Sequence, residues 1–354
     1  MKIALIADIH VNKYLNEDFR LHDILNVIQQ MCEFCKKNNI KNLSILGDFW
    51  SNRKTIDVQI LHFGHLILEK IIENFEKITI IPGNHDQYYK SNDEVSSIRH
   101  FVAYKNCKVV KNPTATTIDN TILFYFPYIE SQERLLLHLE KTKLINKDKS
   151  FKKVFFMHQC VLGCTTDSGF KITTGIPPGK ILSYCDMVFS GDIHTHQVLR
   201  NNGKQFVYVG SPLAQSFNDE GKSFGFVVFD TETLQWQHIK TKHREFHTVS
   251  YESVDKNASK ITDNIVKIVF NGNEMWTREG VQSKLNEIAE KYHPKRIVHM
   301  LTERKQISEQ KEQQVENFEF KELVKEYIKR TKPEGLNAKI LAETFNNIKQ
   351  AAQT

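Results

Sequence analysis

The sequence contains no uninterrupted apolar run of about eighteen residues, the length that a membrane-spanning helix needs. Its first apolar stretch is broken by Asp8, which is too early for a signal peptide. The P-loop pattern G-x-x-x-x-G-K-[ST] is also missing, because the nearest approach, Gly175 to Lys180, has the wrong spacing. We therefore expect a soluble cytoplasmic protein with no membrane partner and no ATPase activity of its own.

Cysteine is scarce, with six residues in 354. Cys32 and Cys35 form a C-x-x-C pair, and Cys160 and Cys164 form a C-x-x-x-C pair. A zinc site is an open alternative. We favour a structural role for the first pair, because it lies on the apolar face of a predicted helix, where free cysteine behaves as a small hydrophobe.

The residues that are present favour an ordered, enzyme-sized protein. The chain is 40% hydrophobic and 25% charged, which is sufficient for a sizeable core and for more than one domain. Its net charge of +6 suits a polyanionic substrate but does not identify one.

Strands and helices alternate in the first two-fifths of the chain. Apolar periodicity predicts strands at 2–7, 42–46 and 77–81, separated by helices at 18–37 and 55–75. Further strands are predicted at 121–126, 153–157, 187–190, 205–209 and 225–229, with a Gly/Pro/Thr-rich loop at 163–179. Beyond residue 247 the pattern predicts a strand at 264–270, a helix at 278–291 and a strand at 295–301. A polar segment at 308–317 precedes two amphipathic helices.

Polar residues follow these strands at their carboxyl ends, where open α/β sheets place catalytic groups. They are Asp8-x-His10, Gly47-Asp48, Gly83-Asn84-His85-Asp86, a lone His158, and Gly191-Asp192-x-His194-x-His196. Each group alone is compatible with a turn or a half-buried histidine, but their joint occurrence indicates a site. Carboxylate, imidazole and amide ligands suit manganese, iron or zinc. We expect two ions about 4 Å apart, with Asp48 as the bridging carboxylate.

This series resembles the calcineurin-like metallophosphoesterase superfamily, whose motifs are D-x-H, G-D, G-N-H-[DE], a lone H and G-H-x-H. The stretch from Val209 to Phe217, with its Gly-Ser-Pro and Ser-Phe, further resembles SbcD-type DNA repair nucleases and their phage counterparts. The resemblance implies an α+β fold, a four-layer α/β/β/α sandwich. It divides the chain into a nuclease domain at 1–246, a small α/β capping and DNA-binding domain at 247–307, and a linker with a C-terminal helix pair at 308–354.

The resemblance also implies a role for each motif residue. The first metal would be bound by Asp8, His10, Asp48 and His194, and the second by Asp48, Asn84, His158 and Asp192. His85 would contact the scissile phosphate, and Asp86 would orient and polarise His85.

Two departures from the family pattern matter. Asp192 stands where the family has the first histidine of G-H-x-H. Aspartate binds manganese, so we prefer this ungapped alignment. The alternative uses His194 and His196 and requires a slip of two residues. The segment from Phe49 to Arg53 lacks the acidic or histidine residue common in the nucleases, and also lacks the protein phosphatase pattern G-D-x-V-D-R-G.

The implied function is a manganese-dependent exonuclease on duplex DNA ends and endonuclease on single strands. In this family the nuclease is usually a homodimer that forms a heterotetramer with an SMC-type, SbcC-like ATPase, bound through the C-terminal helices. A phage-encoded protein would act in the host cytoplasm. The alternatives are a nucleotide or protein phosphatase, and a DNA-end-binding scaffold weakened by the change at Asp192.

Overall fold

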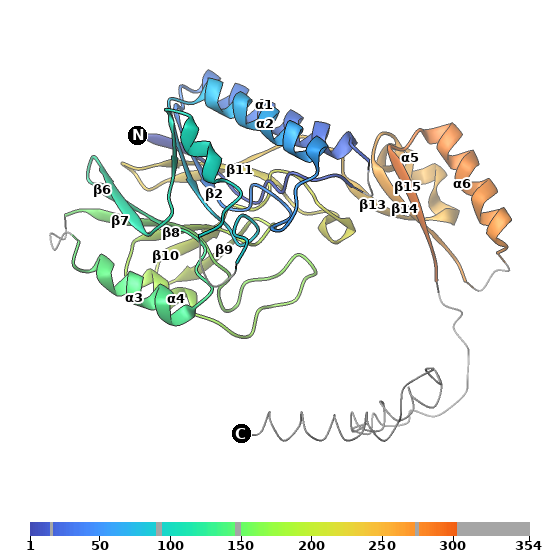
Figure 1. Cartoon of the computed structure of the whole chain (residues 1–354). Helices are drawn as coiled ribbons and strands as arrows, with labels where there is room; N and C mark the ends of the chain where they lie inside the picture. The colour runs from blue at the N-terminus through green and yellow to red at the C-terminus, as the bar shows by residue number, and fades with distance from the viewer. Residues whose placement is uncertain (15–16, 90–93, 146–149, 273–275, 303–354) are drawn as a thin grey trace, which may run out of the picture. The chain divides into compact units, whose positions relative to one another are not determined.

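The alternating strands and helices at the beginning of the chain build one mixed sheet. The computed structural model (Figure 1) describes residues 1–14, 17–89, 94–145, 150–272 and 276–302. The strand order of this sheet is β12-β11-β1-β2-β3-β4. Neighbouring strands from β1 to β4 run parallel, whereas β11 and β12 are antiparallel additions beside β1. The strands are β1 (Lys2–Ile6), β2 (Asn42–Leu46), β3 (Lys77–Ile81), β4 (Cys107–Val109), β11 (Gly225–Asp230) and β12 (Trp236–Lys240).

The middle of the chain forms a second sheet with the order β5-β6-β7-β8-β10-β9 in the described residues. Its central strands β6, β7, β8 and β10 are parallel, with antiparallel strands at both edges. The strands are β5 (Thr114–Ile118), β6 (Thr121–Phe126), β7 (Lys152–His158), β8 (Met187–Gly191), β9 (Gln197–Asn201) and β10 (Lys204–Tyr208).

The two sheets pack face to face, and helices cover their outer faces. Alternate residues of a strand point to opposite faces, and here both faces are buried. In β1, Ala4 and Ile6 pack with helices α1 and α2, while Ile3 and Leu5 pack with residues of the second sheet. A third apolar cluster joins the second sheet to α3 and α4. The predicted four-layer α/β/β/α sandwich is thus confirmed.

A capping side chain determines where helix α2 begins. The helices are α1 (Phe19–Lys37), α2 (Val58–Asn74), α3 (Gln132–Thr142), α4 (Pro178–Leu182), α5 (Ala258–Ile261) and α6 (Arg278–Tyr292). Helix α2 was predicted from residue 55, but it begins at Val58 because Asp57 accepts hydrogen bonds from the backbone NH groups of Gln59 and Ile60. Cys32 and Cys35 are buried in the apolar layer beneath α1, as expected for structural cysteines.

A third, parallel sheet follows with the order β13-β14-β15 in the part of the chain described. Its strands are β13 (Phe246–Ser250), β14 (Ile265–Phe270) and β15 (Arg296–Leu301), and α6 packs on one face. Phe246 and Ile265 share an apolar cluster with Phe19 of α1 and with Phe224. Ion pairs Arg244–Asp23 and Arg296–Glu17 join the same regions. The third sheet therefore contacts the sandwich at the N-terminal end of α1. In the sequence, this sheet begins close to the predicted domain boundary at residue 247.

The predicted linker and C-terminal helix pair lie outside the described residues. Within the ranges described, none of the helices is long and apolar enough to cross a membrane.

Candidate metal centre

The polar residues predicted to form a site all follow strands of the two facing sheets. Asp8 and His10 follow β1, Asp48 follows β2, and Asn84 and His85 follow β3, all in the first sheet. His158 ends β7, and Asp192 and His194 follow β8, in the second sheet. Because the parallel strands end at one edge of each sheet, the side chains converge where the two edges meet.

One group of side chains consists of Asp8, His10 and His194. One ligand atom from each lies within 4.8 Å of the others. The Nε2 atoms of His10 and His194 are 3.1 Å apart, and His10 Nε2 is 3.6 Å from Asp48 Oδ2. Two imidazole nitrogens that face each other so closely are well placed to share a cation.

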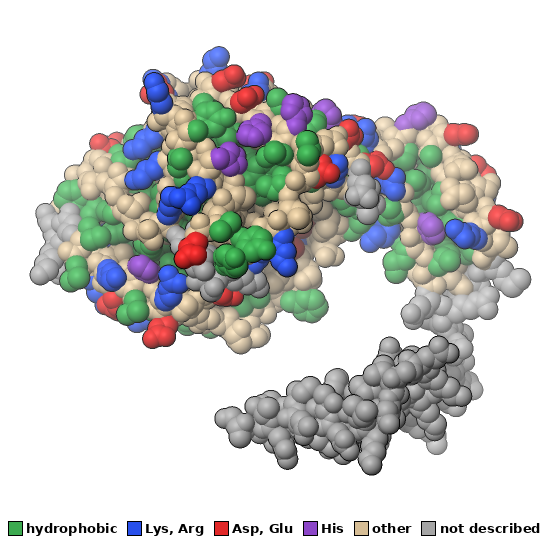
Figure 2. Space-filling view, viewed as in Figure 1, with side chains coloured by type: hydrophobic (Ala, Val, Ile, Leu, Met, Phe, Trp, Pro, Cys, Tyr) green, Lys and Arg blue, Asp and Glu red, His purple; other side chains and the backbone are tan. Residues whose placement is uncertain are grey.

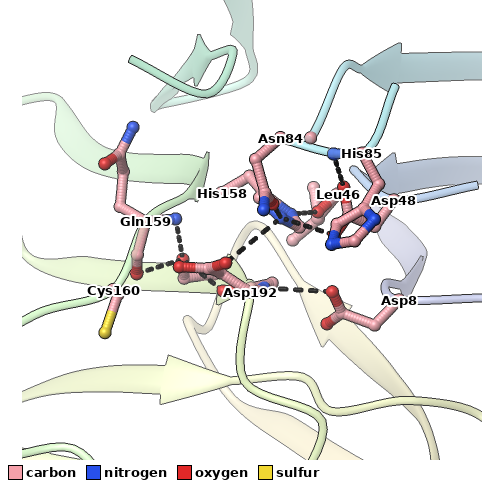
Figure 3. A network of polar contacts seen from close by, with 12 residues as sticks. Asp8, Leu46, Asp48, Asn84, His85, His158, Gln159, Cys160 and Asp192 are labelled. Carbon is pink, nitrogen blue, oxygen red and sulfur yellow. Dashed lines mark hydrogen bonds and ion pairs between the residues drawn. The ribbon is translucent and has the colours of Figure 1, made fainter. Parts of the chain in front are cut away.

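A second group consists of Asp8, Asp48 and His158, again within 4.8 Å of one another. His158 Nε2 lies 3.3 Å from Asp48 Oδ2, 3.0 Å from Asn84 Oδ1 and 3.8 Å from Asp192 Oδ1 (Figure 3). The structure thus brings together all seven side chains predicted to bind metal. Asp8 belongs to both groups, and Asp48 of the second group lies 3.6 Å from His10 of the first. The bridging role of Asp48 stays a prediction.

Backbone conformation at this site is unusual. Asp8, His10, Asp48 and Asp192 all have φ between 47° and 83°, a left-handed region that non-glycine residues seldom adopt. Hydrogen bonds stabilise these turns: the NH groups of Asp8 and His10 donate to the carbonyls of Gly47 and Asp48. Clustered conformations of this kind are typical of functional sites, where the surrounding structure fixes them.

The motif glycines are explained by close packing around Asp48 and His158. A Cβ atom at Gly83 would lie 2.1 Å from Asp48 Oδ1, and one at Gly191 would lie 2.6 Å from His158 Nδ1. At Gly47 it would lie 2.3 Å from His158 Nδ1, at a backbone φ of +88°. Glycine is therefore required at these positions, because a side chain would displace Asp48 or His158.

Three histidines present Nε2 to the site because an acceptor engages Nδ1. His158 Nδ1 is 2.7 Å from the Leu46 carbonyl, His85 Nδ1 is 2.6 Å from the Ser51 carbonyl, and His194 Nδ1 is 2.9 Å from Asp167 Oδ2. A carbonyl oxygen can only accept, so Nδ1 of His158 and of His85 carries hydrogen. The lone pair is then on Nε2, the arrangement typical of metal-ligating histidine.

The role expected for Asp86 must be corrected. Its carboxylate accepts hydrogen bonds from the backbone NH groups of Phe49, Trp50 and Gly83, at 3.3, 3.1 and 3.0 Å. His85 is oriented by the Ser51 carbonyl instead. Asp86 therefore connects the loop after β2 to the loop after β3, and acts on His85 only through the backbone. The sequence did not indicate this, because backbone donors leave no residue pattern.

Electrostatics at the site favour a bound cation. Burial raises the pKa of Asp8 to about 7 and lowers the pKa of His10 to about 3. Burial also opposes ionisation of Asp48, but the charge of His158 overcomes it and holds the Asp48 pKa below its ordinary value. In the described ranges, no lysine or arginine forms an ion pair with Asp8, Asp48 or Asp192. Asp8 Oδ2 is buried without a partner. These residues fit divalent metal ions.

His196 lies apart from the cluster. Its Nδ1 is 2.8 Å from the Tyr208 carbonyl, and its ring stacks on His238 with centroids 4.1 Å apart. The backbone NH of Asp192 donates to Asp8 Oδ1 at 3.1 Å, which directs the loop after β8 into the site. The geometry therefore agrees with the ungapped alignment, in which Asp192 and His194 are the last ligands.

The Gly-Ser-Pro segment lies beside the same loop. The backbone NH of Ser211 donates to the His194 carbonyl at 2.8 Å. Gln215 Nε2 donates to the Asp8 carbonyl at 3.0 Å. The segment thus supports two of the ligand-bearing turns, a role that its resemblance to the nucleases did not specify.

Comparisons with known proteins identify the group to which this arrangement belongs. A family described as calcineurin-like phosphoesterase matches residues 1–196. Exonuclease subunit 1 of Enterobacteria phage T4 is 26% identical over 292 residues, which cover 76% of this chain and 82% of the phage protein.

Solved structures were also compared. An archaeal phosphodiesterase has a TM-score of 0.38 at 13% identity, covering 68% of this chain and 100% of its own. A dimetal phosphatase from Danio rerio has a TM-score of 0.39 at 11% identity, covering 64% of this chain and 91% of its own.

Proposed function

Because the chain belongs to the calcineurin-like phosphoesterase family, we propose that it is a manganese-dependent DNA nuclease that hydrolyses phosphodiester bonds with two metal ions. The observation that carries this proposal is the similarity to a phage exonuclease subunit, which spans 76% of the chain and so exceeds the family match over residues 1–196. Charge gives no independent support, since lysine and arginine are interspersed with acidic residues on the face shown in Figure 2.

The ligands divide into two sets that share one carboxylate. Asp8, His10, Asp48 and His194 would bind the first ion, and Asp48, Asn84, His158 and Asp192 the second. When bound, two such ions supply an activated water and neutralise charge on the phosphate. We infer manganese rather than magnesium because the two sets contain three imidazoles, His10, His158 and His194, and magnesium prefers oxygen ligands.

His85 is the residue that we propose contacts the scissile phosphate. Its ring lies 5.0 Å from that of His10, between centroids, but it is in neither group of candidate ligands. With Nδ1 donating to the Ser51 carbonyl, Nε2 is the atom that can take up a proton. A protonated His85 would donate this proton to the departing sugar oxygen.

We further propose that the protein works as a subunit. The phage relative is named as exonuclease subunit 1, which supports a partner protein and a DNA substrate. By resemblance, the partner would be an SMC-type ATPase that forms a heterotetramer with this chain and binds the segment where the sequence predicts two C-terminal helices. The sheet β13–β15 with α6 would cap the site and contact DNA.

The test is cleavage of end-labelled duplex and single-stranded DNA in manganese, with wild type, His85→Ala and Asp192→Ala compared. We expect strong loss in both variants. Full activity of His85→Ala would refute the mechanism, and full activity of Asp192→Ala would move the ligand set to His194 and His196. A contrary result is that the protein hydrolyses nucleotides or small phosphomonoesters and leaves DNA intact even when the ATPase partner is present. That result would show that the protein is a phosphatase and not a nuclease.

A further inference from the structure

Asp167 contacts a candidate metal ligand from a loop for which no role is assigned. Its Oδ2 lies 2.9 Å from Nδ1 of His194, while Nε2 of the same ring lies 3.1 Å from His10 Nε2. We propose that Asp167 is a positioning residue that orients His194 toward the first metal and couples the loop at 163–176 to metal binding. This inference rests on the metal centre of the proposed function.

The loop that carries Asp167 is an ordered hairpin. Its two arms exchange hydrogen bonds, from Gly163 NH to the Ile172 carbonyl at 2.8 Å and from Ile172 NH to the Cys164 carbonyl at 2.9 Å. Thr165 and Lys171 pair as an antiparallel bridge. Asp167 is therefore part of the tight turn at the end of this hairpin.

The hairpin is attached to the strand that follows His194. Thr165 and Gln197 exchange two hydrogen bonds, of 2.9 and 2.8 Å, and Gln197 is the first residue of β9. On the other side, Lys222 Nζ donates to the backbone carbonyl of Asp167. The carboxylate is thus directed to His194 by contacts that do not involve His194 itself.

A carboxylate in this position has a defined chemical effect. It accepts the hydrogen of Nδ1, fixes the plane of the ring, leaves the lone pair on Nε2, and raises the basicity of the ligand. Backbone carbonyls have this role at His158 and His85, where no side-chain substitution can remove it. Asp167 is a side chain, so here the contribution can be measured.

The coupling must act in both directions. If the contact between Asp167 and His194 strengthens metal binding, then metal binding must strengthen that contact by the same free energy. This contact is one of those that hold the hairpin in place. Bound manganese should therefore protect backbone amides of residues 163–172 from hydrogen exchange. A residue that only stabilises the fold would protect them equally with and without metal.

The experiment is calorimetric titration of metal-free protein with Mn²⁺, for wild type, Asp167→Ala and Asp167→Asn. We expect Asp167→Ala to weaken one of two sites by about 10- to 100-fold, the usual range for such partners. Asp167→Asn should lose less, because its side-chain oxygen still accepts from Nδ1. Ser168→Ala, one residue further in the same turn, is the matched control and should bind as wild type. Hydrogen exchange with and without Mn²⁺ is measured on the same proteins.

The outcomes separate this inference from the proposed function. Wild-type affinity in Asp167→Ala, with one site lost in His194→Ala, would overturn the role of Asp167 and leave the metal centre intact. Fewer than two Mn²⁺ ions on wild type would overturn both. If Asp167→Ala failed to fold, two other measurements would test the coupling: the Mn²⁺ affinity of Asp167→Asn and the manganese-dependent protection of the wild-type hairpin. Wild-type affinity in Asp167→Asn together with no change in protection would refute the coupling.

Discussion

Oδ1 of Asp48 accepts a hydrogen bond of 2.8 Å from the backbone NH of His85. The carboxylate expected to bridge two ions thereby also fixes the turn of the histidine expected to contact phosphate. If both expected roles hold, one side chain sets the position of the metal ligands and of the residue that contacts the substrate.

Replacement of this carboxylate should remove both ions. Asp48→Asn keeps an oxygen for the His85 NH but loses the charge that lies beside His10 on one side and His158 on the other. We expect no saturable Mn²⁺ binding at micromolar concentrations and no DNA cleavage, measured by calorimetry and nuclease assay. Asp263→Asn, a substitution of an exposed aspartate, is the control. Two ions retained by Asp48→Asn would contradict the bridging role.

His85 should matter for cleavage but not for metal binding. His85 is not one of the seven side chains proposed as metal ligands, so His85→Ala should bind two Mn²⁺ ions as wild type does. The cleavage rate should fall by about 10²- to 10⁴-fold, the usual contribution of a general acid. His62→Ala, at an exposed histidine of α2, should change neither quantity. If His85→Ala lost Mn²⁺ binding as well as DNA cleavage, His85 would be a metal ligand instead.

Two glycine substitutions separate crowding of the site from backbone strain. At Gly83, a Cβ would meet Asp48 Oδ1 at 2.1 Å, so Gly83→Ala should displace this carboxylate and weaken Mn²⁺ binding. At Gly221, a Cβ would meet nothing within 4 Å, but φ is +74°. Gly221→Ala should lower stability by about 1–2 kcal/mol and leave metal affinity unchanged. Calorimetry measures the Mn²⁺ affinity of both variants, and thermal melting measures their stability. Equal Mn²⁺ affinities of Gly83→Ala and Gly221→Ala would refute the distinction.

His238 should contribute to acid sensitivity of the fold. Burial lowers its pKa from 6.5 to about 4, with further lowering by His196 and Lys240. As pH falls below 6.5, the unfolded chain takes up the proton first, so stability decreases down to about pH 4. His238→Phe keeps a ring for stacking on His196 and removes the titration. Melting temperatures of this variant should fall less between pH 6.5 and 4. His62→Phe is the control. If the melting temperature of His238→Phe fell with pH as steeply as that of wild type, His238 would not be a source of the acid sensitivity.

Much of the fold was predictable because its central strands are apolar on both faces. The predicted ranges 42–46, 77–81 and 121–126 coincide with β2, β3 and β6, and polar residues marked where such strands end. The edge strands of the two sandwich sheets were not predicted. β9 and β12 are partly exposed on both faces and lack a clear alternation. Helix α3 was also missed, although Ser131 at its N-cap and the buried pair Leu135 and Leu139 are a usable signal.

The candidate ligands were predictable from sequence, whereas their supporting contacts were not. Asp167 and His194 are 27 positions apart, and their contact depends on a hairpin whose shape no residue periodicity indicates. Asp86 was assigned to the wrong neighbour, because its partners are backbone NH groups. The choice between Asp192 and His196 likewise required the path of the chain after β8, which the hydrogen bond from Asp192 NH to Asp8 sets.

The pairing of β1 with β11 has a consequence for synthesis of the protein. Lys2 pairs with Asp230, so one edge of β1 stays without its partner strand until residue 230 has left the ribosome. The turn that bears Asp8 and His10 likewise precedes the turn that bears Asp192 and His194 by about 180 residues in the sequence. The second turn is therefore made much later than the first. A nascent chain therefore has one unpaired edge on the apolar strand β1 during most of its translation, and such an edge is prone to aggregation. The candidate metal ligands can therefore come together only after more than half of the polypeptide has been made.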